Sequence, residues 1–149
     1  MYHAVKSDFE KVKEIFYLHK KWFPHVRTDY MKRMIAKKNL ILENDVVITY
    51  NFYKRKQKIG DVQAFKGDCI LHQIVAKTKG TASDVLQRFF KFVNHNPLGR
   101  RVYLSVRSDN EMAKNFYLKN NMKLIGKTSW SKGTLPGDVF VYDPRTYKT

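Results

Sequence analysis

The spacing of apolar residues along the chain predicts four amphipathic helices. Apolar side chains recur three and four positions apart in four segments, which places them on one face of a helix. Helical spacing covers residues 7–23, 28–38, 83–94 and 108–120. The Asn-Pro-Leu-Gly segment at 96–99 should end the third helix, because proline and glycine interrupt helical structure.

Shorter runs with alternating or clustered apolar residues predict strands between these helices. The turn sequences Asn44-Asp45 and Gly67-Asp68 each join two such runs, and Pro136-Gly137 separates the last two. The charged segment 54–60 is expected to be a loop. The predicted strands are 2–5, 40–43, 46–52, 62–66, 69–75, 102–106, 123–130 and 138–142.

This order of elements predicts a mixed α/β sheet. Consecutive hairpins make the early strands antiparallel, and the crossover through the helix at 83–94 requires a parallel pair. The chain has 149 residues and no linker rich in glycine, serine or proline, so we expect a single domain over residues 1–149. Two Ser-x-x-Glu sequences, beginning at Ser7 and Ser108, predict capping boxes at the starts of the first and last helices.

The charge balance limits the partners of the protein. The chain has 29 Lys and Arg against 13 Asp and Glu, a net charge of +16. Residues 1–60 and 61–149 each contribute +8, so the charge is not confined to a tail. Nucleic acid, an anionic small ligand or a basic proteome would each explain it. The densest run, Lys54-Arg55-Lys56-Gln57-Lys58, suits nucleic acid or a solvated loop.

The remaining composition excludes several classes of protein. Cys69 is the single cysteine, so a disulfide framework and a cysteine-based zinc site are excluded, and no metal site is expected. The longest apolar runs are too short to span a bilayer, so no membrane partner is expected. The N-terminal sequence shows no signal-peptide pattern, and we expect a cytoplasmic protein.

The segment 77–83, Lys-Thr-Lys-Gly-Thr-Ala-Ser, lies between a predicted strand and a predicted helix. Backbone N–H groups and the positive end of the helix dipole favour an anion at such a position. Gly80 permits close approach, and Lys77 and Lys79 add positive charge. The segment lacks the Gly-Lys-Ser/Thr ending of a Walker A loop, so it is either an anion-binding loop or an ordinary basic turn.

A second pattern lies in the last predicted helix. Asn110, Ala113 and Tyr117 are spaced by three and four residues and share one helix face, and Asn121-Met122 follows them. This stripe is also compatible with a core-facing helix.

Together, and in this order, the two segments resemble motifs of the GNAT superfamily of N-acetyltransferases. Lys77, Gly80 and Ala82 align with the family's Gln/Arg-x-x-Gly-x-Gly/Ala loop, with lysine in the first place. Asn110, Ala113 and Tyr117 align with its later Asn, Ala and Tyr, while Asn121-Met122 replaces Gly-Phe. The resemblance implies a mostly antiparallel, twisted sheet of about seven strands flanked by about four helices.

The resemblance also implies acetyl-CoA as cofactor and an amine as acceptor. The family binds acetyl-CoA where two strands splay apart, with the pyrophosphate in the glycine loop. The residues that the resemblance assigns to the cofactor are Ile74, Val75, Lys77, Thr78, Lys79, Gly80, Thr81, Ala82, Ser83, Asn110, Ala113 and Phe116. The acceptor, a small-molecule or peptide amine, is not identified by the sequence, and the protein is expected to be a monomer or homodimer.

Two residues are the catalytic candidates that the resemblance implies. Tyr117 matches the general acid that protonates the leaving thiolate; a tyrosine pKa near ~10 against a thiol near ~8.5 requires a lowered tyrosine pKa or concerted transfer. His72 stands on the strand where the family often places a base. A buried core tyrosine and a structural histidine are the alternatives. Glu43 is expected to be solvated, and His25 to lie near the acceptor.

Two other functions remain open from the sequence. The +16 charge and the 54–58 run also suit a nucleic-acid-directed enzyme on the same scaffold, resembling the Mom-type DNA modifiers, or a basic nucleic-acid-binding module. A catalytically inactive fold that binds a partner is the third reading, because a fold does not by itself establish chemistry.

Overall fold

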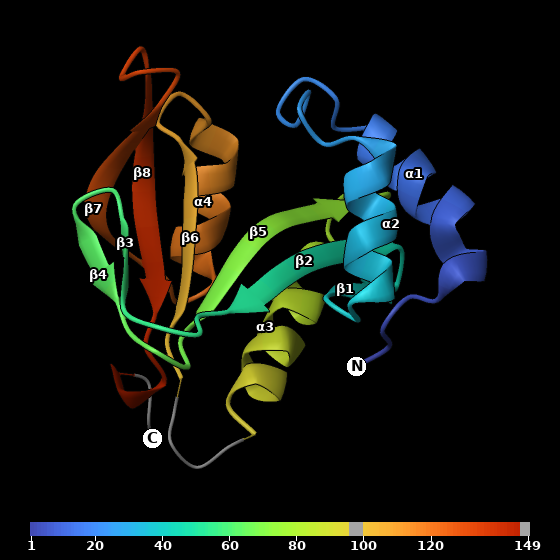
Figure 1. Cartoon of the computed structure of the whole chain (residues 1–149), viewed down its shortest axis with the longest axis horizontal. Helices are drawn as coiled ribbons and strands as arrows, with labels where there is room; N and C mark the ends of the chain where they lie inside the picture. The colour runs from blue at the N-terminus through green and yellow to red at the C-terminus, as the bar shows by residue number, and fades with distance from the viewer. Residues whose placement is uncertain (96–99, 147–149) are drawn as a thin grey trace. The chain divides into compact units, whose positions relative to one another are not determined.

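The computed structural model describes residues 1–95 and 100–146 and contains the predicted mixture of helices and strands (Figure 1). The predicted stop of the third helix at 96–99 lies outside the described residues. No helix within the described residues is long and apolar enough to cross a membrane. The helices are α1 (Phe9–Tyr17), α2 (Thr28–Ala36), α3 (Ala82–Val93) and α4 (Glu111–Lys119); the strands are β1 (Leu40–Glu43), β2 (Val46–Phe52), β3 (Gln57–Ile59), β4 (Val62–Ala64), β5 (Cys69–Ala76), β6 (Val102–Arg107), β7 (Lys123–Trp130) and β8 (Leu135–Tyr142).

The sheet is mixed and mostly antiparallel, as predicted. Six strands follow the order β1-β2-β5-β6-β8-β7, and β3 and β4 form a separate two-stranded sheet. The pair β5–β6 is parallel, through Cys69–Val102 and Ile70–Tyr103, whereas β1–β2, β3–β4, β6–β8 and β7–β8 are antiparallel. Contacts group the chain into two compact units: the first unit comprises residues 1–50 and 72–89, and the second unit residues 51–71 and 90 onward.

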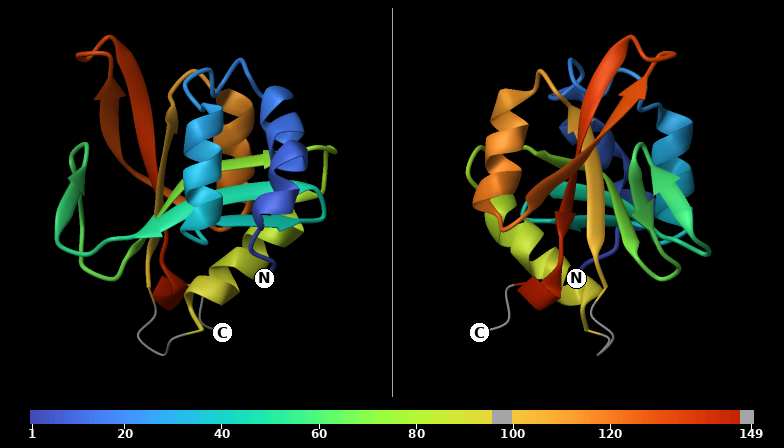
Figure 2. Two further views of the ribbon diagram at one scale, coloured as in Figure 1. Left: turned by 45° about the vertical axis from the view of Figure 1, so that its right-hand side comes forward. Right: turned by 90° about the vertical axis from the view of Figure 1, so that its left-hand side faces the viewer.

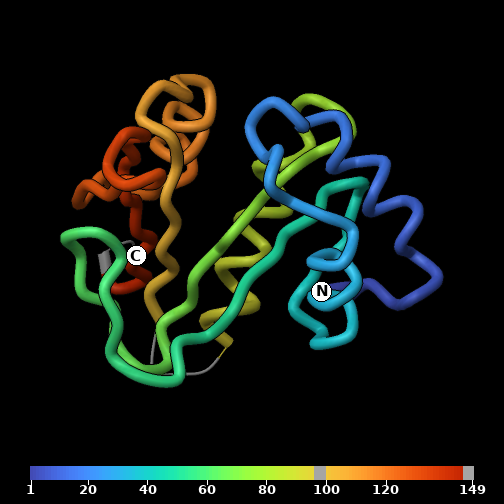
Figure 3. The backbone as a smooth tube through the Cα atoms, turned by 45° about the horizontal axis from the view of Figure 1, so that its top comes forward, coloured from blue at the N-terminus to red at the C-terminus, as the bar shows by residue number. Residues whose placement is uncertain are grey.

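The first unit is built on β1, β2 and the later part of β5, which run side by side (Figure 3). The β1–β2 turn matches the prediction, because Asn44 and Asp45 both have positive φ angles, +49° and +58°, as a tight two-residue hairpin turn requires. Five consecutive residues of β2, 46–50, are buried, so both faces of the strand are covered. α1 and α2 pack on the face that carries Val47 and Val75, and α3 places Phe89 5.3 Å from the ring of Tyr50.

The second unit combines the β6-β8-β7 sheet with α4 and a projecting hairpin (Figure 2). We call this hairpin, residues 53–68, the arm. Its base is closed by backbone hydrogen bonds from Tyr53 N–H to the Asp68 carbonyl and from Gly67 N–H to the Tyr53 carbonyl, both 2.8 Å. β3 and β4 form its outer part, and β3 occupies the segment predicted to be a charged loop.

Several other local predictions were wrong. Residues 2–5 form a single bridge, from His3 to Ile41, rather than a strand. Ser7 does not cap α1; instead the Val5 N–H donates to the Asp8 carboxylate at 2.8 Å, and a 3-10 turn precedes the helix. Pro136-Gly137 lies within β8, where it pairs with Ser129 and Thr128, and the β7–β8 turn lies in residues 131–134.

Candidate functional site

The loop at 77–81 connects β5 to α3 and is exposed over Lys77, Thr78, Lys79 and Gly80. Its shape is held from within and from the neighbouring hairpin. The Thr81 hydroxyl donates to the Thr78 carbonyl at 2.9 Å, and the Lys77 N–H donates to the Asp45 carbonyl at 2.9 Å. The loop is therefore an ordered surface turn that leads directly into a helix N-terminus.

Gly80 provides open space at this turn. Its φ angle of +93° is one that residues with a side chain rarely adopt. A Cβ placed on Gly80 would meet no other atom of the described residues within 4 Å, so the space beside this glycine is open among them. The first N–H groups of α3, which begins at Ala82, lack partners within the helix, and the helix dipole adds positive potential there. These features fit an anion such as a pyrophosphate.

The charged side chains around the loop differ in whether they have an ion-pair partner. Lys77 pairs with Glu14 at 3.2 Å across a partly exposed contact. Lys79 is exposed and has no carboxylate partner among the described residues. Asp84, in the first turn of α3, is paired with Arg88 at 3.2 Å. Lys79 is therefore the cation of this loop whose charge is available to a ligand.

The strand before the loop carries three further predicted residues. Burial alternates along β5, with Leu71, Gln73 and Val75 buried, while Ile74 is half-buried and His72 exposed on the other face. The surrounding protein partly desolvates His72 and lowers the pKa of its imidazole below 6.5. The ring is therefore neutral at pH 7, the form that accepts a proton.

Gln73, next to His72, belongs to the core rather than to the exposed face. Its carbonyl oxygen accepts a hydrogen bond from Tyr30 at 2.9 Å and another from Thr49. These buried partners fix the orientation of this part of β5.

In the second unit, Asn110 is the N-cap of α4. Its side-chain oxygen accepts a hydrogen bond from the Ala113 N–H at 3.2 Å. The motif spacing of Asn and Ala three apart is therefore satisfied by helix capping. The predicted capping box at Ser108 was wrong, because Glu111 is the first helical residue and the Ser108 hydroxyl points elsewhere.

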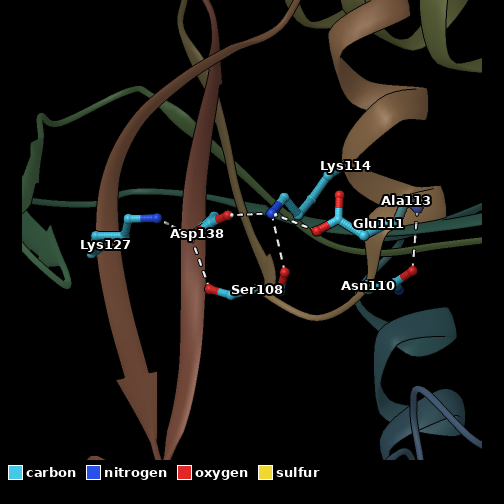
Figure 4. A network of polar contacts seen from close by, with 7 residues as sticks. All are labelled: Ser108, Asn110, Glu111, Ala113, Lys114, Lys127 and Asp138. Carbon is cyan, nitrogen blue, oxygen red and sulfur yellow. Dashed lines mark hydrogen bonds and ion pairs between the residues drawn. The ribbon is translucent and has the colours of Figure 1, made fainter.

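Ser108 belongs to a polar network around the buried Asp138 that the sequence did not indicate (Figure 4). Its hydroxyl donates to Asp138 at 2.9 Å, and Asp138 also pairs with Lys127 at 2.6 Å and Lys114 at 3.1 Å. Asp138 is 1% exposed, and these donors lower its pKa from 3.8 to about 2. Lys114 additionally donates to the Ser108 carbonyl at 3.0 Å, so the network ties the start of α4 to β7 and β8. Thirty residues separate Ser108 from Asp138, a distance at which sequence spacing carries no signal.

Tyr117 is buried in the second unit, 7% exposed, between the rings of Phe116 at 5.6 Å and Phe140 at 5.7 Å. Burial raises the pKa of Tyr117 above its usual value of 10. Among the described residues, its hydroxyl has no hydrogen-bond partner. Of the two routes open to a tyrosine acid, a lowered pKa is therefore not supported, and concerted transfer remains.

α4 is followed by an asparagine with a positive φ angle. Asn121 has a φ angle of +68°, and the next residue, Met122, donates its N–H to the Tyr117 carbonyl at 3.1 Å. Asparagine thus takes the left-handed position that glycine often fills at a helix end.

Three other residues considered in the sequence have clear positions. Glu43 is 15% exposed and pairs with Arg88 at 2.6 Å, so the expectation that it is solvated was wrong. His25 is exposed, with its ring 6.5 Å from that of Phe23. Cys69 is buried, and burial raises the pKa of its thiol, which makes it inert as a nucleophile.

The predicted site residues fall into two groups. The first unit contains His72, Ile74, Val75 and the loop residues Lys77 to Ser83, in continuous sequence along β5 and into α3. The second unit contains Asn110, Ala113, Phe116 and Tyr117, all at or within α4. The first group presents an open turn at a helix N-terminus, and the second a packed helix with one buried tyrosine.

The chain is similar to known proteins in structure and not in sequence. No family model matches the sequence, and no curated protein matches it. A GNAT-family acetyltransferase from Bacillus cereus is similar at 17% identity and a TM-score of 0.68, over 95% of this chain and 94% of that one. NAA60 from Arabidopsis thaliana in complex with acetyl-CoA is similar at 14% identity and a TM-score of 0.69, over 95% of this chain and 97% of that one. A ribosomal-protein-alanine N-acetyltransferase from Brucella melitensis is similar at 10% identity and a TM-score of 0.70, over 95% of this chain and 98% of that one. The chain therefore has the fold of the GNAT acetyltransferases.

Proposed function

We propose that residues 1–149 act as one acyltransferase domain that transfers an acetyl group from acetyl-CoA to an amine. The observation that carries this proposal is the open glycine turn at the start of α3, on a chain with the fold of acetyltransferases. The A. thaliana protein of the same fold was solved with acetyl-CoA bound. A small-molecule or peptide amine is the proposed acceptor class.

The loop residues fit the pyrophosphate of coenzyme A. The backbone N–H groups from Gly80 to Ser83 would hold its oxygens, and Lys79 would contribute a charge that no described carboxylate neutralises. Backbone groups at Ile74 and Val75 would bind the pantetheine chain. When bound, acetyl-CoA supplies an activated thioester whose acetyl group the acceptor amine takes up directly.

Tyr117 and His72 would manage the protons of this reaction. Because burial raises its pKa, Tyr117 stays protonated across the physiological range and holds a proton for the leaving sulfur. The same raised pKa opposes complete proton transfer to a free thiolate, so the proton must move as the charge develops. His72, neutral at pH 7, is the candidate that accepts the proton of the amine, directly or through water.

The proposal is tested by release of free thiol from acetyl-CoA in the presence of polyamines and of peptides with free amino groups. We expect thiol release with one of these classes. Tyr117→Phe should lower the turnover by roughly 100-fold or more, the usual contribution of a general acid, with acetyl-CoA binding retained. Tyr103→Phe removes the hydroxyl of another buried tyrosine and should leave turnover unchanged. Acetyl-CoA binding without thiol release for any amine would contradict the transferase proposal.

The pH dependence of kcat separates the two proton carriers. The rate should be lost on the acid side only below pH 6.5, because the pKa of His72 is lowered, and His72→Gln should remove that acid limb. On the alkaline side Tyr117 must stay protonated, so its ionisation should not reduce the rate below pH 10. An acid limb that is identical in His72→Gln would exclude His72 as the base.

A further inference from the structure

We propose that the arm, residues 53–68, is a binding surface for single-stranded nucleic acid. The inference is independent of acyl transfer, since all the residues that carry it lie in the second unit outside the glycine loop. It rests first on exposed cations of the arm that form no ion pair among the described residues and lie outside the glycine loop.

Four exposed cations stand together on the arm: Lys54, Arg55, Lys56 and Lys58. Among the described residues, no carboxylate lies within ion-pair distance of any of them. The arm also contains Lys66 and two acidic residues, a net charge of +3 in sixteen residues. The arm therefore carries a local excess of positive charge suited to a phosphate backbone.

The two acidic residues of the arm form no ion pair with these cations, and their carboxylates accept hydrogen bonds from backbone N–H groups instead. Asp61 accepts from the Lys127 N–H at 2.8 Å, and Asp68 accepts from the Phe65 N–H at 3.0 Å. Both carboxylates therefore stabilise the backbone conformation of the arm and form no ion pair with its lysines.

The arm is held in place against β7 and does not need to be ordered by a ligand. Asp61 makes two hydrogen bonds to the backbone of Lys127, because its own N–H also donates to the Lys127 carbonyl at 3.0 Å. Glycines allow this close approach: a Cβ on Gly60 would lie 2.1 Å from the Lys127 carbonyl oxygen, and one on Gly126 would lie 2.3 Å from the Asp61 carboxylate. A preformed surface loses less entropy on binding.

Exposed aromatic rings accompany the cations. Phe52, directly before the arm, is 42% exposed, and Phe65, near its end, is 47% exposed. At its exposure, the Phe65 ring can stack on a base, which single strands permit and a closed duplex does not. Cations combined with exposed aromatics favour a single strand over a duplex and over an acidic protein.

The test is fluorescence anisotropy of a labelled single-stranded RNA, and a DNA of the same sequence, about 20 nucleotides long, longer than one typical single-strand site. Four phosphate contacts predict a slope of about −3 for log affinity against log salt, so binding should weaken roughly 50-fold between about 50 and 200 mM salt. Replacing Lys54, Arg55, Lys56 and Lys58 by glutamine should flatten that slope and cost at least roughly tenfold in affinity. A matched variant removes four exposed lysines elsewhere, Lys6, Lys37, Lys91 and Lys119, and should change affinity less than about threefold.

Phe65→Ala separates stacking from charge. It should weaken binding by roughly fivefold or more while leaving the salt slope unchanged, since a neutral ring releases no counterions. Equal losses in the two quadruple variants, tighter binding of the duplex, or no effect of Phe65→Ala would each overturn the proposal. Competition by polyglutamate as effective as that by RNA of equal charge would also overturn it, in favour of an acidic protein. Unchanged melting temperatures confirm that the variants remain folded.

Discussion

The glycine loop of the first unit and α4 of the second unit carry the two sequence motifs, and the structure uses them differently. At the loop, Gly80 faces open space and Lys79 lacks a described carboxylate partner. At α4, Asn110 caps the helix and Tyr117 is packed between two aromatic rings. The α4 motif is thus explained largely by folding. In the loop, Thr81 and Lys77 make contacts within the protein, whereas Gly80 and Lys79 remain open to a ligand. Substitutions at Asn110 and in the network around Asp138 should therefore change stability, and substitutions at the loop should change ligand binding.

The largest stability effect is expected at Asp138, which anchors the start of α4. Its folded pKa of about 2 lies below its usual 3.8, a difference worth about 2 kcal/mol at neutral pH. This stability is fully present above about pH 4 and is lost as the pH falls through the folded pKa near 2. Asp138→Asn should lower the free energy of unfolding by about 2 kcal/mol at pH 7 and much less near pH 2. Urea unfolding at both pH values measures the difference. An equal loss at both would show that the charge of Asp138 is not what stabilises α4.

A smaller loss is expected from removing the helix cap. Asn110→Ala should cost about 1 kcal/mol, because the Ala113 N–H loses its acceptor. Asn110→Asp retains an acceptor at the same position and should keep most of the stability. If both variants were equally destabilised, the role of Asn110 would not be capping.

The smallest effect on stability is expected at Tyr117. Its hydroxyl has no partner among the described residues, so Tyr117→Phe should change the free energy of unfolding by less than about 0.5 kcal/mol. The same variant is expected to lose turnover, so one substitution separates folding from chemistry. A large loss of stability would mean that the hydroxyl serves the fold.

The sequence predicted those features that depend on neighbouring residues. The apolar runs at 40–43 and 46–52, joined by the Asn44-Asp45 turn, predicted the β1–β2 hairpin with its observed bounds. Asn121 likewise takes the left-handed position after a helix, which asparagine adopts more readily than most residues. In these cases, local backbone preference and burial agree.

Features that depend on distant residues were missed. Ser108 and Glu111 satisfy the capping-box spacing, yet the Ser108 hydroxyl binds Asp138 on a strand thirty residues away. Glu43 has the sequence environment of a solvated hairpin end, but Arg88 of α3 covers it. The raised pKa of Tyr117 likewise comes from burial by the tertiary structure. Such contacts have no signature in local spacing.

The most direct test of the proposed acetyl-CoA site is a thermal melt with and without acetyl-CoA, on three proteins. Gly80→Ala adds a Cβ where the pyrophosphate is proposed to lie. Gly133→Ala is the matched control, because Gly133 also has a positive φ angle, +87°, and open space around its Cβ position. Both variants carry the same backbone strain, on the order of 1–2 kcal/mol.

At about 100 times its dissociation constant, acetyl-CoA should stabilise the wild-type protein by roughly 2.7 kcal/mol, a rise of roughly 5–10 °C. We expect the same rise in Gly133→Ala and a much smaller one in Gly80→Ala. No rise in the wild-type protein, or equal rises in all three proteins, would contradict binding of acetyl-CoA at the glycine loop.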